Sequence, residues 1–95
     1  MKIQIKYFAA LREIVGKKVE FVELDGGVRV QDVISHLVEI YGTSLEQHLF
    51  DKQGKLSTSY QLLINGINIS TLEGLETPLK EGDTLAILPP VGGGA

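Results

Sequence analysis

The stretch VQDVISHLVEIY, residues 30–41, decides the fold class of this chain. Its apolar residues recur at the spacing of one helix face: Val30, Val33, Ile34, Leu37, Val38 and Tyr41. Gly42 is a natural helix stop. The start is weakly marked, because Arg29 stands where a Ser, Thr or Asp cap is preferred, although Asp32 favours the helix dipole. We therefore expect one amphipathic helix with a single buried face.

Two strands are expected before this helix. Residues 2–8 alternate between apolar and polar side chains, and Phe8 falls on the polar side. The inward side chains would be Ile3, Ile5 and Tyr7. Residues 9–16 predict one or two helical turns, and residues 17–24 a second strand. The phase of that strand is ambiguous, since either Val19 with Phe21 or Val22 with Leu24 could face inward.

A connector, a hairpin and a last strand are expected after the helix. Residues 43–59 show no sustained period and predict a connector with one helical turn. Asn65-Gly66, between apolar runs, predicts a hairpin with a type I′ turn. In it, Ile64 would lie opposite Ile67 and Leu62 opposite Ile69, with Leu63 on the outer face. In the strand at 84–88, Leu85 and Ile87 would face inward and Leu88 outward.

These elements predict an α+β fold with a mixed sheet of four to five strands packed on one main helix. If the last strand lies beside the first, the fold is a β-grasp, the ubiquitin-like roll; the pattern alone also permits other small α+β folds. We expect one β-grasp domain over residues 1–91 and a flexible glycine tail over 92–95.

Composition excludes several classes of partner and chemistry. The 95 residues carry a net charge of −3 with scattered Lys and Arg, which argues against nucleic acid and against an anionic membrane. No apolar run approaches the roughly 20 residues of a membrane span, and the expected location is cytoplasmic. The absence of cysteine excludes disulfides, thiolate metal sites and cysteine nucleophiles.

No independent active site is expected. His36 and His48 are isolated, and the sequence shows no acid/base pair, nucleophile triad or phosphate loop. We therefore predict no metal site and no bound cofactor.

The segment ILPPVGGGA, residues 87–95, has a different character. Pro89 and Pro90 end the strand because they cannot donate ladder hydrogen bonds, and glycines bury no side chain. From Pro89 to Gly94 an extended chain would reach roughly 20 Å at about 3.3 Å per residue. Such a tail could enter a partner's buried pocket while the domain stays outside.

The segments YFAALREIVG (7–16) and TPLKEGDTLAILPPVGGG (77–94), joined by the amphipathic helix and an INGI hairpin, resemble the MoaD/ThiS family of ubiquitin-like sulfur carriers. The MoaD branch is the nearer match, and the resemblance weakens over residues 43–59. It implies that a MoaB/ThiF-like E1 activating enzyme uses ATP to adenylate the C-terminal glycine carboxylate, which then becomes a thiocarboxylate. The sulfur would pass to a MoaE-like large subunit of molybdopterin synthase for molybdenum cofactor biosynthesis.

The resemblance also implies the site residues. Gly94, preceded by Gly93, would carry the adenylate and the thiocarboxylate. Ala95 departs from the Gly-Gly ending of the family, so we expect a peptidase to remove it. The partner-binding residues would be Phe8, Arg12, Leu63, Leu88, Pro89, Pro90 and Gly92. We expect Phe8 and Leu88 to be substantially exposed, whereas Arg12 could instead pair locally with Glu13.

Three other functions stay open. Relatives of the archaeal type are ubiquitin-like protein modifiers, joined through the terminal glycine to lysines. Carriers for thiamine synthesis or tRNA thiolation share the same ending. An interaction domain with an inert tail is the third alternative.

Overall fold

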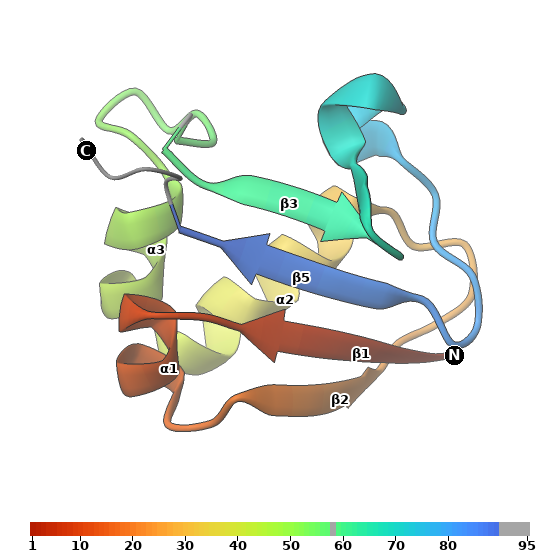
Figure 1. Cartoon of the computed structure of the whole chain (residues 1–95), viewed down its shortest axis with the longest axis horizontal. Helices are drawn as coiled ribbons and strands as arrows, with labels where there is room; N and C mark the ends of the chain where they lie inside the picture. The colour runs from red at the N-terminus through yellow and green to blue at the C-terminus, as the bar shows by residue number, and fades with distance from the viewer. Residues whose placement is uncertain (58, 90–95) are drawn as a thin grey trace.

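Two parallel strands at the centre of the sheet, β1 (Lys2–Tyr7) and β5 (Thr84–Leu88), join distant parts of the chain in this computed structural model (Figure 1). The structure describes residues 1–57 and 59–89. Antiparallel strands flank the central pair, with β2 (Val19–Glu23) beside β1 and β3 (Gln61–Ile64) beside β5. The two-residue strand β4 (Ile67–Asn68) pairs with β3.

The strand order is β2-β1-β5-β3-β4, which confirms the predicted mixed sheet and its β-grasp connection. The predicted domain boundary at residue 91 and the tail 92–95 lie outside the described residues. No helix in the described ranges is long and apolar enough to cross a membrane.

The helices leave one face of the sheet uncovered. Helix α2 (Val30–Tyr41) lies across the other face, behind the strands in Figure 1. Helices α1 (Ala10–Val15) and α3 (Thr43–Leu49) lie at the end where β1 and β5 finish. Two 3₁₀ turns, η1 (Ile69–Thr71) and η2 (Gly74–Glu76), precede β5.

The core forms where the inward side chains of β1 and β5 pack against the apolar face of α2. Its fully or almost fully buried members from these elements are Ile3, Ile5, Tyr7, Val30, Val33, Ile34, Leu37, Leu85 and Ile87. Helix α3 adds Leu45 and Leu49, both at 0% exposure. The first part of the expected connector is therefore a helix of seven residues that closes the core beside α2.

The start of α2 shows how the weak N-terminal signal is compensated. The backbone N–H of Arg29 donates to the carboxylate of Asp32 at 2.8 Å. Asp32 thus caps the helix from inside its first turn, in the position where a capping box places its acidic residue.

The structure resolves the phase of β2. Val22 is buried at 5% exposure, whereas Val19 and Phe21 are 41% and 60% exposed on the uncovered face. Val22 and Leu24 are therefore the inward pair, and Glu20 shares their side of the sheet because side chains alternate along a strand.

The hairpin forms at the predicted turn. Asn65 and Gly66 have φ of 50° and 86°, and both positive values fit a type I′ turn. Ile64 pairs with Ile67 as expected. Ile67 therefore shares the face of the buried Ile64, as predicted, although it remains 51% exposed at the edge of the sheet. The predicted Leu62–Ile69 pair does not form, because β4 ends at Asn68 and the chain turns into η1.

Candidate functional site

The candidate site is the end of the sheet from which the chain continues beyond β5. Tyr7 and Ile87 are register partners on β1 and β5. Phe8 and Leu88 directly follow these partners, and Pro89 is the last residue described. The two predicted partner-binding side chains are therefore brought to neighbouring strand ends.

Arg12 covers part of this end. Its guanidinium carbon lies 5.3 Å from the centroid of the Phe8 ring, within cation–π range. Its Nε donates to the carbonyl of Tyr7 at 3.0 Å. The predicted substantial exposure of Phe8 and Leu88 is wrong in degree, since both are half-buried. Phe8 is shielded by Arg12, and Leu88 lies between strands with Gln61 of β3 as its register partner.

Leu63 extends the same surface. It is half-buried on β3 and pairs with Ala86, two residues before Leu88 on β5. Residues in this diagonal relation on neighbouring strands are within reach of long side chains. We call Phe8, Leu63, Leu88 and Pro89 the tail-side patch. The remaining predicted site residues lie outside the described ranges: Pro90, Gly92, Gly93, Gly94 and Ala95.

The backbone at Ala9 sets the geometry of the patch. Ala9 has φ 52° and ψ −130°, a conformation that costs a residue with a Cβ of order 1–3 kcal/mol. It turns the chain from β1 into α1, so that Arg12, one helical turn later, returns over Phe8. The strain therefore lies directly beside the predicted partner-binding residues.

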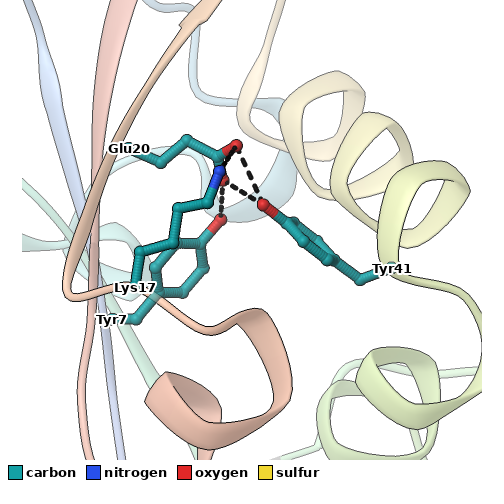
Figure 2. Close-up of polar contacts among 4 residues, drawn as sticks. All are labelled: Tyr7, Lys17, Glu20 and Tyr41. Atoms are coloured by element: carbon teal, nitrogen blue, oxygen red, sulfur yellow. Dashed lines mark hydrogen bonds and ion pairs between the residues drawn. The ribbon is translucent and has the colours of Figure 1, made fainter.

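A polar cluster on the helix-covered side of β1 and β2 was not predicted. Figure 2 shows the side chains of Tyr7, Lys17 and Tyr41 meeting the carboxylate of Glu20. The hydroxyl of Tyr7 donates to Oε1 at 2.8 Å, and that of Tyr41 lies 2.7 Å from Oε1 and 2.9 Å from Oε2. Lys17 Nζ is 3.3 Å from Oε2. We call these four residues the Glu20 cluster.

Hydrogen bonding decides the charge state of the Glu20 cluster. Burial alone would raise the pKa of Glu20, but donation by Tyr41, Tyr7 and Lys17 outweighs burial and lowers it below the ordinary value. Burial and the adjacent carboxylate raise the pKa of both tyrosines. Glu20 is thus a fixed anion with satisfied acceptors, which suits it to hold β1, β2 and α2 together. The only sign of this cluster in the sequence was that Glu20 occupies an inward-facing position of β2, where an apolar residue is usual.

No catalytic constellation accompanies these features. Within residues 1–57 and 59–89, no three His, Asp or Glu side chains gather as metal ligands would. An open hollow between α2, α3 and residues 50–54 is lined by Ser35, Val38 and Phe50 among others, and none of the four residues of the tail-side patch lines it. What the arrangement offers is a half-buried apolar surface beside the last described residue, Pro89, which precedes the glycine-rich segment in the sequence.

Comparison with known proteins decides the family. A sequence model described as the ThiS family matches residues 5–94, nearly the whole chain. The chain belongs to the ThiS family. This ThiS-family protein is 32% identical over 94 residues to small archaeal modifier protein 3 of Haloferax volcanii, a match that covers 99% of this chain and 100% of that protein.

Solved structures agree with this assignment. The solution structure of small archaeal modifier protein 1 from Methanosarcina acetivorans superposes with a TM-score of 0.84 at 39% identity, covering 96% of this chain and 94% of that one. The molybdopterin synthase sulfur carrier subunit of Chlamydomonas reinhardtii is 25% identical, covering 99% of this chain and 100% of that protein. The ThiS-family protein is therefore a ubiquitin-like β-grasp protein with relatives named as modifiers and as sulfur carriers.

Proposed function

We propose that this protein is a ubiquitin-like modifier of the archaeal type, activated at the carboxylate of Gly94 and joined to lysine side chains of other proteins. The observation that carries the proposal is the full-length match to small archaeal modifier protein 3, together with the TM-score of 0.84 to small archaeal modifier protein 1. The more specific expectation, a subunit of molybdopterin synthase, has weaker support, because the relatives of that name are 25% and 29% identical.

The chemistry needs an activating enzyme, since the described residues supply no catalytic group of their own. An oxygen of the terminal carboxylate attacks the α-phosphorus of ATP, pyrophosphate leaves, and an acyl-adenylate forms. A lysine amine then attacks the acyl carbon and AMP leaves, which gives an isopeptide bond. Glycine suits both steps because it has no Cβ to block approach to the carbonyl.

A second candidate function shares the first step. If a sulfide equivalent in place of an amine attacks the acyl-adenylate, the product is a thiocarboxylate and the protein is a sulfur carrier. A relative from Archaeoglobus fulgidus that is 38% identical over 65 residues is named a putative sulfur carrier protein. The ThiS family match ends at Gly94, which supports the same activated residue for either function.

One reconstitution separates the two functions. The chain ending at Gly94 is incubated with an E1-like enzyme and ATP, first with a sulfide donor and then with a cell extract treated to inhibit peptidases. Conjugation predicts a ladder of larger proteins that carry a Gly94 isopeptide on lysine, identified by mass spectrometry after digestion. Sulfur carriage predicts an intact mass increased by the exchange of one oxygen for one sulfur.

The control is a chain with Gly93-Gly94 deleted. A ladder that persists with this control would contradict conjugation through Gly94. An unmodified chain in all reactions, with no ATP–pyrophosphate exchange, would overturn both functions and leave an interaction domain.

A further inference from the structure

A lysine stands among the apolar side chains of the uncovered face of the sheet. Since Tyr7 is buried on the inner side of β1, alternation turns Lys6 outward, and its side chain is exposed. The register partners of Lys6 are Val19 on β2 and Ala86 on β5. Ala86 is in turn the partner of Leu63 on β3. Lys6 therefore borders the tail-side patch.

Arg12 places a second cation at the same surface. Its guanidinium lies over the Phe8 ring, and its Nε donates to the carbonyl of Tyr7. Within residues 1–57 and 59–89, neither Lys6 nor Arg12 forms an ion pair with a carboxylate. The local pairing of Arg12 with Glu13 that the sequence allowed is therefore not formed. Both positive charges are exposed at the border of an apolar surface.

The uncovered face is basic although the protein is acidic. The chain carries 12 acidic and 9 basic residues. Among the outward side chains on the described strands β1, β2, β3 and β5, Glu23 is the one acid, and it pairs in register with Lys2 at the start of β1. Glu81 lies at that same end, because its carboxylate accepts from the N–H of Lys2 at 3.1 Å. The charges are thus separated along β1, with Lys6 and Arg12 at the tail-side end.

Any surface that covers the tail-side patch must also meet these two cations. A partner that removes water from Phe8 and Leu88 removes water from the neighbouring ammonium and guanidinium groups as well. A charge that is buried without a partner is strongly destabilising. The covering surface therefore needs carboxylates opposite Lys6 and Arg12. The terminal nitrogens of a guanidinium can hold such a carboxylate in bidentate geometry.

We propose that Lys6 and Arg12 form, together with the tail-side patch, a docking surface for an acidic face of the activating enzyme. The inference rests on the proposed function, in which such an enzyme holds the domain while the carboxylate of Gly94 reacts. The partner is an acidic protein and not a nucleic acid, because two cations set among apolar side chains neutralise few phosphates and the net charge of the chain is −3. Complementary charges of this kind fix orientation and speed association.

ATP–pyrophosphate exchange with the E1-like enzyme of the same organism tests the surface, with the chain ending at Gly94 as the varied substrate. Lys6→Glu and Arg12→Glu should each raise the KM for this protein roughly tenfold or more. The KM of the wild type should rise with NaCl concentration, and the rise should be smaller in both variants. Lys80→Glu is the matched control, because Lys80 is exposed in the turn before β5, at the end where β1 begins.

Circular dichroism checks that the variants are folded. Arg12 also binds the carbonyl of Tyr7, so a poorly folded Arg12→Glu is replaced by the pair Lys6→Gln and Lys6→Glu. Removal of the Lys6 charge should raise the KM, and its reversal should raise it further.

Wild-type KM and wild-type salt dependence in both Lys6 variants, with exchange intact, would overturn the docking surface and leave activation at Gly94 standing. An equal rise in KM for Lys80→Glu would overturn it too, because net charge alone would then explain the effect. So would binding of a labelled DNA duplex that Lys6→Glu abolishes while the KM is unchanged. No exchange with any chain, the wild type included, would overturn the proposed function and this surface together.

Discussion

The rings of Tyr7 and Tyr41 meet edge to face, with centroids 6.5 Å apart and planes at 83°. Both hydroxyls reach the single carboxylate of Glu20. Tyr7 ends β1, and Tyr41 ends α2. One carboxylate therefore ties the central strand to the helix that covers it, close to the tail-side patch.

Removing the hydroxyl of Tyr41 should show how much its hydrogen bonds to Glu20 contribute to the free energy of unfolding. Tyr41→Phe deletes the donor to both oxygens of Glu20 and leaves a partly buried charge with fewer partners, so we expect unfolding free energy to fall by about 1–3 kcal/mol. Urea denaturation gives the value. Tyr60→Phe, outside the Glu20 cluster, serves as the control for loss of a tyrosine hydroxyl. Equal small effects of both substitutions would show that the cluster adds nothing.

The Glu20 cluster should also make stability depend on pH. Since the pKa of Glu20 is lowered in the folded state, its contribution is fully present above the ordinary carboxyl value of about 4.3 and is lost as pH falls through the folded value. The difference in unfolding free energy between wild type and Glu20→Gln should therefore be largest near neutral pH and shrink in acid. Urea midpoints at a series of pH values measure it. A difference that grows in acid would contradict the assignment.

The hairpin turn offers a test of backbone conformation. Gly66 has φ +86°, and a Cβ there would meet no atom within 4 Å, so the cost of Gly66→Ala is conformational strain alone, about 1–2 kcal/mol. Gly26→Ala is the control, because Gly26 has equal space and no positive φ of this kind. Thermal unfolding compares them. A similar loss for both would mean that the positive φ is not what the turn requires.

The tail-side patch should contribute to binding of the activating enzyme. Phe8→Ala and Leu88→Ala each remove a half-buried apolar group at the proposed contact, and a truncated anchor costs more than 1 kcal/mol, or roughly fivefold in affinity. Titration calorimetry with the E1-like enzyme measures the change. Leu72→Ala, an exposed apolar residue after η1, should bind as the wild type does. Unchanged affinity in all three folded variants would remove the patch from the interface.

Activation at Gly94 is the fifth prediction. The carboxylate of Ala95 stands one residue further along and beside a methyl group, so the 95-residue chain should support slower ATP–pyrophosphate exchange than a chain ending at Gly94. A chain ending at Gly93 controls for length. Equal rates for the 95- and 94-residue chains would remove the need for a peptidase.

Most of the fold could be predicted from the sequence because its strongest apolar patterns each fit only one type of secondary structure and one buried face. Alternation fixed Ile3 and Ile5 in the core, and the spacing of Val30 to Tyr41 fixed α2. The phase of β2 could not be predicted, since both phases carry apolar residues. It depends on Glu20, whose inward position is stabilised by two tyrosines that come from β1 and α2.

The site was less predictable for a similar reason. Phe8 was predicted to be substantially exposed, but Arg12 shields its ring, and the turn that leads to Arg12 has a positive φ at Ala9. The predicted Leu62–Ile69 pair was wrong because the second arm of the hairpin, β4, stops after two residues, which alternation does not reveal. Both errors arise where a strand ends, at Ala9 after β1 and at Ile69 after β4, because alternation does not predict the backbone beyond a strand.

The parallel pairing of β1 with β5 has a consequence for synthesis. Gln4 pairs with Thr84, so the centre of the sheet joins residues 80 positions apart and cannot form until β5 has left the ribosome. A nascent chain that stops before Thr84 lacks the central strand, and both halves of the sheet stay unjoined. We therefore expect products that stop before Thr84 to be open to proteases, whereas a chain that reaches Leu88 carries every strand of the sheet.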